Sequence, residues 1–507
     1  MIPLAIITAT AFVLSLLITP VVRKYALQAG FCDQPDGGRK KHLTATAVGG
    51  GVAVLFGFFG AIFILLASPN VWGGELSQDP LFLIGLMVSA TVLCGVGLID
   101  DRIRLRGRQK LVGQACAATI LILSGLLIES VTIFDYQLDL GLLAFPFTLF
   151  WILGAINALN LIDGVDGLAT SVGLILSIGL AGMCFLSHHW SDGVLALMIA
   201  GSLAGFLYHN LPPAKIFLGD GGSMLIGLVL GALAIRSSLK GPATIALAAP
   251  TAIMAVPIFD VLMAILRRKL TGRSLYAHDR GHLHHRMQAK GYSTTKLLLI
   301  FGSLCTLTVL GAFVSVYQKN EMLAFGSVVA VFGMLIVTRV FGHVESLLLI
   351  AKLKKFFMSF TRDAGHERNQ ELMQLQGTKE WEHLWLTLTQ FAERFDLSQV
   401  RLNLNLHSIN EEFHAKWERK SPPDLQEYWS CDIPLHLRDM PLGKVSLMGS
   451  CRSESACEWM GELIAGLKPF ELQLIELIEE QLPLDDSKPA SVPETDESPI
   501  EVQLSHS

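Results

Sequence analysis

The sequence predicts an all-α integral membrane protein with about eleven transmembrane helices, followed by a small soluble α/β domain. The 507 residues are 51% apolar and only 16% charged, and their mean hydropathy is +0.49. These values are typical of polytopic membrane proteins. Long apolar runs fill residues 1–345, whereas the rest of the chain reads as soluble sequence.

The spans are assigned by taking about 20 apolar residues to cross a bilayer. The first run lacks a basic flank and a small-residue cleavage site, so we expect it to be a retained helix. The scattered cysteines contain no C-x-x-C pair and are expected to be reduced packing residues. The expected spans are residues 3–22, 48–68, 81–99, 111–128, 141–159, 168–187, 193–209, 222–236, 243–266, 297–317 and 321–341.

Basic residues set the expected orientation. Lysine and arginine gather in the loops after the first, third and ninth spans, and they are few or missing in the loops after even-numbered spans. Basic loops stay in the cytoplasm. The N-terminus is therefore expected outside and the C-terminus inside, in a multi-pass protein of the inner (plasma) membrane.

The remainder of the chain is expected to form a linker at 346–375, a cytoplasmic α/β domain at 376–483 and a disordered acidic tail at 484–507. Residues 381–395 and 456–480 have helical patterns, and residues 400–406 alternate as a strand. Residues 429–437 and 444–451 indicate a hairpin. No catalytic constellation stands out there, so this domain is expected to be dispensable for chemistry.

Polar clusters follow every odd-numbered span and no even-numbered one. A random scatter of loop residues would not sort in this way, whereas a site assembled at the cytoplasmic membrane face would. The clusters are residues 33–42, 100–110, 157–166, 215–223 and 278–286.

The central cluster reads N-A-L-N-L-I-D-G-V-D-G-L from Asn157. Asn157 and Asn160 are three residues apart, so in a helix they would share a face. Asp163 and Asp166 have the same spacing, beside glycines that allow close backbone approach. A simple cap and turn at the next helix is the alternative.

Two other clusters carry carboxylates at helix ends. Asp100 and Asp101 close a helix, where the macrodipole disfavours anions, so a cation should compensate. They are either paired with nearby arginines or Lys110, or they act as a general base or metal ligand. Asp220 precedes two glycines and is either a helix N-cap or an Mg²⁺ ligand beside a phosphate cradle.

The last cluster, H-D-R-G-H-L-H-H-R, invites three interpretations. His278 and His282 have zinc-ligand spacing. Arg280 beside the imidazoles favours oxyanions such as a diphosphate. A basic loop on anionic lipid headgroups is the third reading.

Together these motifs resemble the polyprenyl-phosphate N-acetylhexosamine-1-phosphate transferases. The resemblance covers residues 1–345 and rests on G-L-I-D-D with Lys110 nine residues later, N-A-L-N-L-I-D-G-V-D-G-L, F-L-G-D-G-G-S and G-H-L-H-H-R. It implies ten or eleven helices and a Mg²⁺-dependent site, with Mn²⁺ as a substitute. That site would transfer a sugar 1-phosphate from a UDP-sugar to undecaprenyl phosphate and release UMP.

The resemblance also implies roles for single residues. Where the family usually has prolines, this chain has Ala45 and Ala47, so His42 is carried over only weakly. Asp163 and Arg280 are further candidates for substrate binding. The implied roles are Asp220 and Asn160 for the metal, Lys110 for the diphosphate, Asp166 for uracil, Asp100 and Asp101 for catalysis, and His282, His284 and His285 for sugar and phosphate.

The expected partners are a UDP-N-acetylhexosamine, undecaprenyl phosphate and the bilayer, without nucleic acid, and a homodimer is compatible with the sequence. The H-L-H-H-R loop favours N-acetylglucosamine and a place at the start of lipid-linked cell-envelope polysaccharide synthesis. The alternatives are the phospho-N-acetylmuramoyl-pentapeptide translocase of peptidoglycan synthesis and a transporter. A transporter is disfavoured because the span centres hold almost no ionisable residues.

Overall fold

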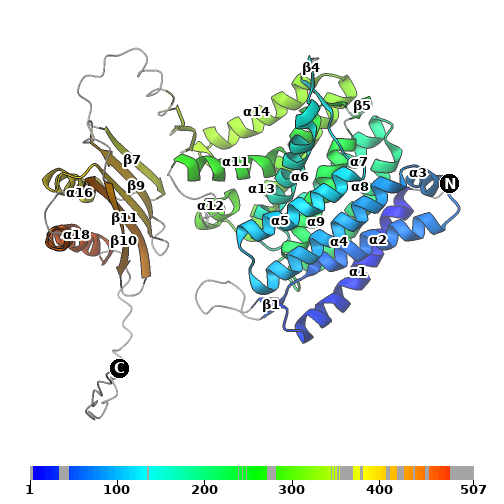
Figure 1. Ribbon diagram of the computed structural model, residues 1–507. Coiled ribbons are helices and arrows are strands. Elements are labelled where there is room, and N and C mark those ends of the chain that lie inside the picture. Colours follow the sequence, from blue (N-terminus) through cyan, green and yellow to red (C-terminus); the bar gives the residue numbers. More distant parts are fainter. Residues whose placement is uncertain are drawn as a thin grey trace, which may run out of the picture. The chain divides into compact units, whose positions relative to one another are not determined.

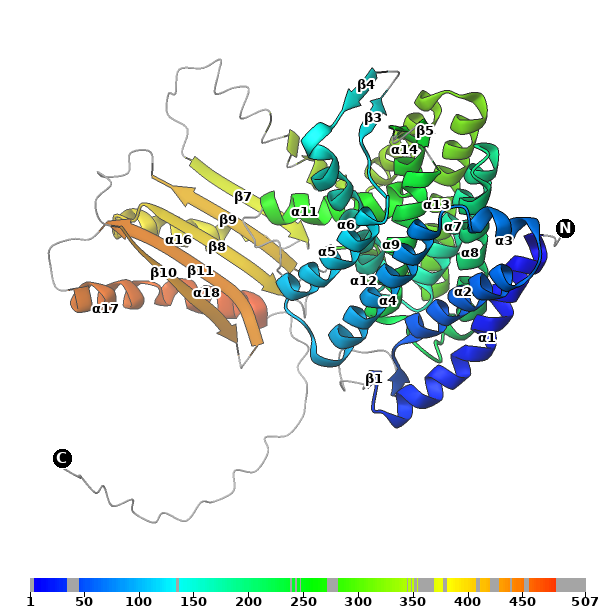
Figure 2. The ribbon, with the colours of Figure 1, turned by 45° about the vertical axis from the view of Figure 1, so that its right-hand side comes forward.

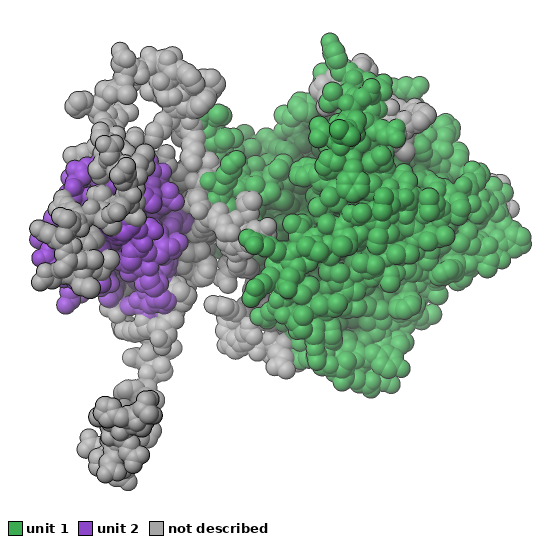
Figure 3. Space-filling view, viewed as in Figure 1, with its two compact units in different colours: residues 1–360 green, residues 361–507 purple. Residues whose placement is uncertain are grey.

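The structure is a computed structural model, and it divides the chain into two compact units, Met1–Phe360 and Thr361–Ser507 (Figure 3). The described residues are 4–33, 45–133, 136–237, 239–241, 244–246, 248–270, 281–343, 345–347, 349–350, 353, 369–376, 381–406, 411–419, 428–437, 440–450 and 456–479.

The first unit is a bundle of apolar helices (Figure 1). Within the described residues, eight helices are long and apolar enough to cross a membrane, namely α1, α2, α4, α6, α7, α8, α9 and α13. The other expected spans appear as the shorter α5, α10 with α11, and α14, so the predicted polytopic helical fold is confirmed. The helices are α1 (Leu4–Gln28), α2 (Gly50–Ala67), α3 (Val71–Leu76), α4 (Pro80–Ile103), α5 (Gly107–Leu123), α6 (Ala144–Ile162), α7 (Leu168–Leu186), α8 (Trp190–Asn210), α9 (Gly219–Arg236), α10 (Ala248–Ile253), α11 (Ala255–Leu270), α12 (Leu283–Ala289), α13 (Thr294–Gln318) and α14 (Glu321–Val337).

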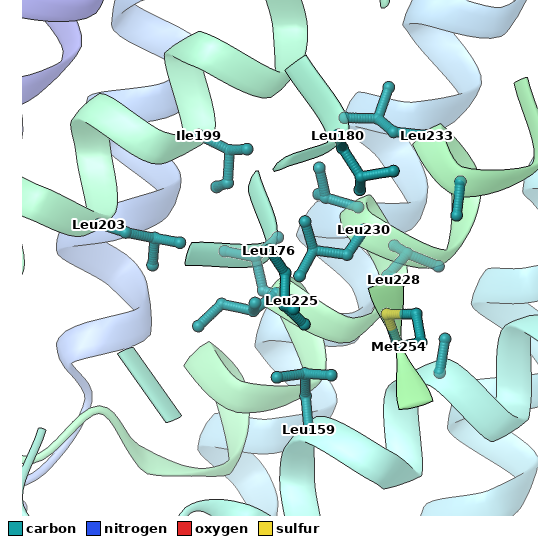
Figure 4. Close-up of a cluster of buried hydrophobic side chains, with 14 of the residues drawn as sticks. Leu159, Leu176, Leu180, Ile199, Leu203, Leu225, Leu228, Leu230, Leu233 and Met254 are labelled. Carbon is teal, nitrogen blue, oxygen red and sulfur yellow. The ribbon is translucent and has the colours of Figure 1, made fainter. Parts of the chain in front are cut away.

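Helix α9 is buried on all sides and lies at the centre of the bundle. A helix that is apolar on every side is normally buried. Small residues on its surface let the neighbouring helices approach closely. A Cβ at Gly227 would lie 2.5 Å from the Cα of Ile156 in α6. Figure 4 shows the surrounding core, with Leu159 of α6, Leu176 and Leu180 of α7, Ile199 and Leu203 of α8, and Leu225, Leu228, Leu230 and Leu233 of α9.

The ninth expected span is broken, which its apolar composition did not predict. Helix α10 ends at Ile253, Met254 lies in a turn, and α11 begins at Ala255. The break follows from Pro257, whose ring lacks an N–H and would clash with the carbonyl four residues earlier, that of Ile253.

Short strands connect the helices at both ends of the bundle. Strands β1 (Cys32–Asp33) and β2 (Thr46–Ala47) pair after α1. A second sheet, which the sequence did not predict, joins the loops after α5 and α9 in the order β4-β3-β6-β5. Its strands are β3 (Ser130–Ile133), β4 (Tyr136–Asp139), β5 (Leu239–Gly241) and β6 (Thr244–Ala246).

Arg236 is one of the few basic residues in the loops expected on the outer side of the membrane. Two carboxylates neutralise its charge there. Its Nε donates to Asp192 at 2.6 Å and its Nη1 to Asp79 at 2.7 Å. Its guanidinium also lies 3.9 Å from the ring centroid of Phe82. The arginine therefore ties the end of α9 to the starts of α4 and α8.

The second unit is a five-stranded antiparallel sheet in the order β10-β11-β8-β9-β7 (Figure 2). Helix α16 contacts both strand β8 and helix α18. The expected helix at 381–395, strand at 400–406 and hairpin are present, but the last helix is interrupted at Leu467. Strand β7 lies in the stretch expected to be linker, and β9 was missed. The elements are β7 (Asn369–Gln376), α16 (Glu382–Arg394), β8 (Gln399–Leu406), β9 (Glu411–Glu418), β10 (Tyr428–Leu437), β11 (Met440–Ser450), α17 (Ala456–Gly466) and α18 (Lys468–Glu479). The predicted acidic tail at 484–507 lies outside the described residues.

Candidate active site

One cavity of about 810 Å³ is lined by residues of all five polar clusters. The chain therefore brings together segments as far apart in sequence as Asp33 and His285, as the one-sided sorting of the clusters predicts. The first cluster contributes only Asp33 to the described residues, and His42 lies outside them. The lining includes Asp33, Asp100, Asp101, Arg104, Asp163, Asp166, Asn210, Asp220, His285, Gln288 and Thr294.

Lys110 bridges two of the candidate carboxylates. Its Nζ lies 2.9 Å from Oδ2 of Asp100 and 2.8 Å from Oδ2 of Asp220. Helix α4 ends at Ile103, and Arg104 turns the chain in a left-handed conformation with φ 53°. Helix α5 then begins at Gly107 and brings Lys110 back over the end of α4. Lys110 is thus the cation expected to compensate the carboxylates at the C-terminal end of α4.

Asp100 and Asp101 have different surroundings although they are adjacent. Besides the Lys110 pair, Asp100 accepts a hydrogen bond at Oδ1 from the Leu105 N–H at 2.7 Å, which closes the turn after α4. Asp101 accepts at Oδ1 from the Asp220 N–H at 3.1 Å. Its Oδ2 is buried and has no hydrogen-bond partner among the described residues. Asp101 therefore keeps one oxygen available in the cavity, whereas both oxygens of Asp100 are engaged.

Asp220 is not a helix N-cap, so that interpretation was wrong. Helix α9 begins at Gly219, and Asp220 lies in its first turn. Its Oδ1 accepts from Nδ2 of Asn160 at 2.6 Å, and the same amide donates to the Ser223 hydroxyl at 2.9 Å. Asn160 thereby orients the Asp220 carboxylate from α6.

The glycines after Asp220 serve helix packing instead of forming an open phosphate cradle. A Cβ at Gly51 would lie 2.3 Å from the Gly222 nitrogen, and one at Gly97 would lie 2.2 Å from the Gly221 Cα. The backbones of α2 and α4 therefore contact the start of α9. Gly219 has φ 76°, and a Cβ there would lie 2.6 Å from Oδ2 of Asp101. That position suits glycine alone.

The donor atoms at this centre fit Mg²⁺ better than zinc. Mg²⁺ binds through one or two carboxylates together with substrate phosphate oxygens. Asp220 lines the cavity and offers one such carboxylate. Across the part of the chain that the structure describes, no group of three His, Cys, Asp or Glu side chains has metal-binding geometry. A closed zinc site needs four such ligands.

Asp163 and Asp166 follow α6 in a tight turn that forms one wall of the cavity. Oδ2 of Asp166 accepts from the Ala214 N–H at 3.1 Å, which ties the turn to the loop before α9. Burial raises the pKa of Asp163 well above its usual value, and the nearby carboxylates Asp220, Asp101 and Asp166 raise it further. An ionised Asp163 is therefore costly unless a cation or a hydrogen-bond donor enters the cavity.

The histidine cluster places three rings in a row. His282 and His284 stack with centroids 5.9 Å apart, and His285 follows at 4.1 Å from His284 and lines the cavity. Burial lowers the pKa of His284 to about 3, so its ring is neutral. The ring packs on the acidic turn, because a Cβ at Gly164 would lie 2.4 Å from its Nε2. His278 and Arg280 lie outside the described residues.

The structure adds residues that sequence reasoning missed. Asp260 in α11 accepts from His282, and Glu345 accepts from Arg267 at 2.5 Å and from Arg286 at 2.8 Å. The signal for Asp260 was available, since an ionisable residue inside a span is a functional candidate by itself.

A further residue that was missed is Gln114, which forms an amide pair with Asn157 beneath the site. Nδ2 of Asn157 donates to Gln114 at 2.9 Å, so Asn157 and Asn160 do lie on the same side of α6 and face α5 and α9. Asn210 is buried, accepts from Thr170 and donates to the carbonyl of Ile216. Partners so distant in sequence could not be paired from spacing alone.

The chain is similar to one family model and to several named transferases. Residues 83–238 match the model of glycosyl transferase family 4. The chain is 34% identical over 296 residues to the probable undecaprenyl-phosphate N-acetylglucosaminyl 1-phosphate transferase of Bacillus subtilis, which covers 57% of this chain and 80% of that relative. It is 34% identical over 343 residues to the decaprenyl-phosphate N-acetylglucosaminephosphotransferase of Mycobacterium tuberculosis, with 62% and 83% covered. A phospho-N-acetylmuramoyl-pentapeptide-transferase of Clostridium novyi is 29% identical over 330 residues, with 61% and 96% covered.

Proposed function

We propose a reaction from one premise: the chain belongs to glycosyl transferase family 4, and within it to the polyprenyl-phosphate N-acetylhexosamine-1-phosphate transferases. It is a multi-pass membrane transferase. The proposed reaction moves N-acetylglucosamine 1-phosphate from UDP-N-acetylglucosamine to undecaprenyl phosphate and releases UMP. The observation that carries the proposal is the pairing of Lys110 with Asp100 and Asp220, two carboxylates that line the cavity where all five clusters meet.

The charges in the cavity suit this reaction. The two substrates bring several phosphoryl charges to the membrane surface, and cationic groups must offset them. Arg102 and Arg104 at the end of α4 line the cavity and supply such groups, and Lys110 pairs with the lining carboxylates Asp100 and Asp220. Asp220, with Asn160 as its orienting partner, would hold Mg²⁺, which when bound would neutralise diphosphate oxygens.

The transfer itself needs one proton acceptor. An oxygen of the lipid phosphate attacks the phosphorus that carries the sugar, a new P–O bond forms, and the bond to the UMP oxygen breaks. If the lipid phosphate arrives protonated, its proton must go to the protein. We assign this role to Oδ2 of Asp101, because it is buried at the cavity and has no partner within the described residues. Asp100 then acts with Lys110 to orient the donor.

Two further features of the proposal follow from the sequence. The basic loops would place the cavity at the cytoplasmic face of the inner membrane. The acceptor is a lipid, so a site at the ends of spans can reach its headgroup without carrying charge to the bilayer centre.

N-acetylglucosamine is proposed because two relatives at 34% identity carry that sugar in their names. The relative that acts on a phospho-N-acetylmuramoyl pentapeptide is less similar, at 29%. That reaction is the second candidate. The family membership also argues against a transporter.

The test uses the purified full-length protein with Mg²⁺ and undecaprenyl phosphate. UDP-N-acetylglucosamine, UDP-N-acetylgalactosamine and UDP-N-acetylmuramoyl pentapeptide are supplied separately, and lipid-dependent release of UMP is measured. We expect turnover with UDP-N-acetylglucosamine, its loss on chelation and its return with Mg²⁺. Asp101→Asn should lower the rate by about 10²–10⁴-fold, the range for a general base.

The same assay contains the outcomes that would refute the proposal. Turnover of the pentapeptide donor alone would establish the second candidate instead. Full activity in excess chelator would show that the reaction does not need Mg²⁺. A near wild-type rate for Asp101→Asn would show that this carboxylate is not the proton acceptor.

A further inference from the structure

Asp260 is a buried carboxylate that the proposed reaction does not use. It lies in α11 and is 1% exposed. Its Oδ2 lies 2.8 Å from Nδ1 of His282, and its Oδ1 accepts from the Leu283 N–H at 2.8 Å. Both partners belong to the start of α12, so one carboxylate holds the segment that carries the histidine row.

The burial of Asp260 is informative because an unpaired buried carboxylate is very costly. Asp260 gains compensation from the His282 ring and one backbone N–H. A merely structural anchor for α12 already exists, since Arg286 of the same helix donates to the buried Glu345 at 2.8 Å. The second carboxylate therefore has a more specific task.

That task concerns the orientation of the His282 ring. A carboxylate only accepts hydrogen bonds, so Nδ1 of His282 carries its hydrogen toward Asp260. Nε2 is then the ring atom left for other contacts. A carboxylate behind a histidine fixes the tautomer and the ring plane in the same way at metal sites.

The orientation of His282 is passed on to the cavity. Its ring stacks on His284 with an angle of 12° between the planes, and His284 packs on the turn at Gly164. His285, the next ring, lines the cavity together with Asp163 and Asp166. A rotation of His282 would therefore disturb the row that forms one wall of the cavity.

We propose that Asp260 is a positioning residue that fixes the tautomer and plane of His282, and through it the histidine row that binds the sugar nucleotide. This inference rests on the proposed function and deepens it, because it names the residue that orients the histidines of the donor site. Asp260 itself does not reach the substrates. Its removal should act on donor binding through His282.

The test is a double-mutant cycle in the full-length protein with UDP-N-acetylglucosamine and undecaprenyl phosphate. Asp260→Asn keeps the shape but presents an N–H to Nδ1, which forces the other tautomer. Loss of a hydrogen bond to a charged group corresponds to about a tenfold or larger rise in the KM of the donor. The KM of the lipid should stay within about twofold. His282→Gln should show the same pattern. In the double variant, the KM of the donor should be no higher than in the more impaired of the two single variants.

A matched control separates positioning from loss of a buried charge. Asp192 is also a buried carboxylate, 2% exposed, but it pairs with Arg236 at the other end of the bundle. Asp192→Asn should lower the melting temperature and leave the KM of the donor unchanged. If Asp260→Asn does not fold, Asp260→Glu keeps the acceptor chemistry and should give a smaller rise in the KM of the donor than His282→Gln.

Additive effects of Asp260→Asn and His282→Gln would overturn the inference, as would a rise in the KM of the lipid alone. In the fallback comparison, an Asp260→Glu effect equal to that of His282→Gln would also overturn it. The wild-type protein in the same assay tests the proposed function: without turnover there, the function itself fails. With wild-type turnover and an unchanged donor KM for Asp260→Asn, only the inference fails.

Discussion

At the scale of single residues, the cavity carries an excess of negative charge that is costly without substrates. Lys110 offsets two carboxylates, Asp100 and Asp220. Asp163 and Asp166 face the same cavity from the next turn. The carboxylates that the proposed function needs therefore lower the stability of the folded protein. Replacing one of them should reveal this cost.

Asp163→Asn should stabilise the protein while impairing its activity. Because the pKa of Asp163 is raised in the folded state, the folded protein binds a proton that the unfolded chain has already lost. Wild-type stability therefore falls as the pH rises from about 4, the ordinary aspartate value, through the raised pKa. The variant cannot ionise and should melt a few degrees higher, by a margin that grows with pH. Thermal unfolding in detergent across that range measures it, and a margin independent of pH would contradict the electrostatic explanation.

The sequence predicted the residues of the centre better than their individual tasks. Asp100 and Asp101 were a pair with open alternatives, because adjacent helical residues point in different directions and spacing does not show which one meets Lys110. Asp260 could have been singled out as an ionisable residue inside a span, but its pairing with His282, 22 residues away, could not be read from the sequence. Only the hydrogen bonds formed in the folded protein distinguish the roles of these residues; composition and spacing do not.

At the scale of helices, the position of Asp220 depends on close backbone packing. The start of α9 contacts α2 at Gly51 and α4 at Gly97, where any Cβ would meet backbone atoms. In membranes, small residues at such contacts let helix backbones approach closely, and the resulting van der Waals packing favours association. The same contacts place Asp220 beside Lys110 and Asp101.

Gly97→Ala should therefore cost both stability and activity. Its Cβ would lie 2.2 Å from backbone atoms of Gly221, and overpacking of this kind costs about 1–3 kcal/mol. Moving α9 away would also shift Asp220. Gly95→Ala in the same helix is the control, since no described atom lies within 4 Å of its Cβ. It should gain up to about 1 kcal/mol from helix propensity and keep its activity. Equal behaviour of the two variants in thermal unfolding and turnover would refute the packing account.

The helices were largely predictable, because apolar runs of the right length are a direct physical requirement of a bilayer. The exceptions have local causes. Pro257 breaks the ninth span, and α9 starts three residues earlier than its apolar run. In the C-terminal unit, β9 was missed because residues 411–418 hold charged and polar side chains among few apolar ones. Its pairing with β8 and β7 decides its structure.

At the scale of the whole molecule, the alternation of spans is what assembles the site. Each pair of spans returns the chain to the same face, so clusters at every odd-numbered loop meet in one cavity. The one-sided sorting predicted this convergence from the sequence. It did not predict which clusters touch, since the order of contacts depends on how α4, α5, α6 and α9 pack.

The central claim is that the chain transfers a sugar together with its phosphate. The most direct measurement supplies the purified protein with undecaprenyl phosphate, Mg²⁺ and UDP-N-acetylglucosamine that is radiolabelled at the β-phosphorus. Sugar 1-phosphate transfer moves this phosphorus into the lipid, so the label should appear in the lipid fraction in step with release of UMP. Transfer of the sugar alone would leave the label in UDP, and that result would contradict the account.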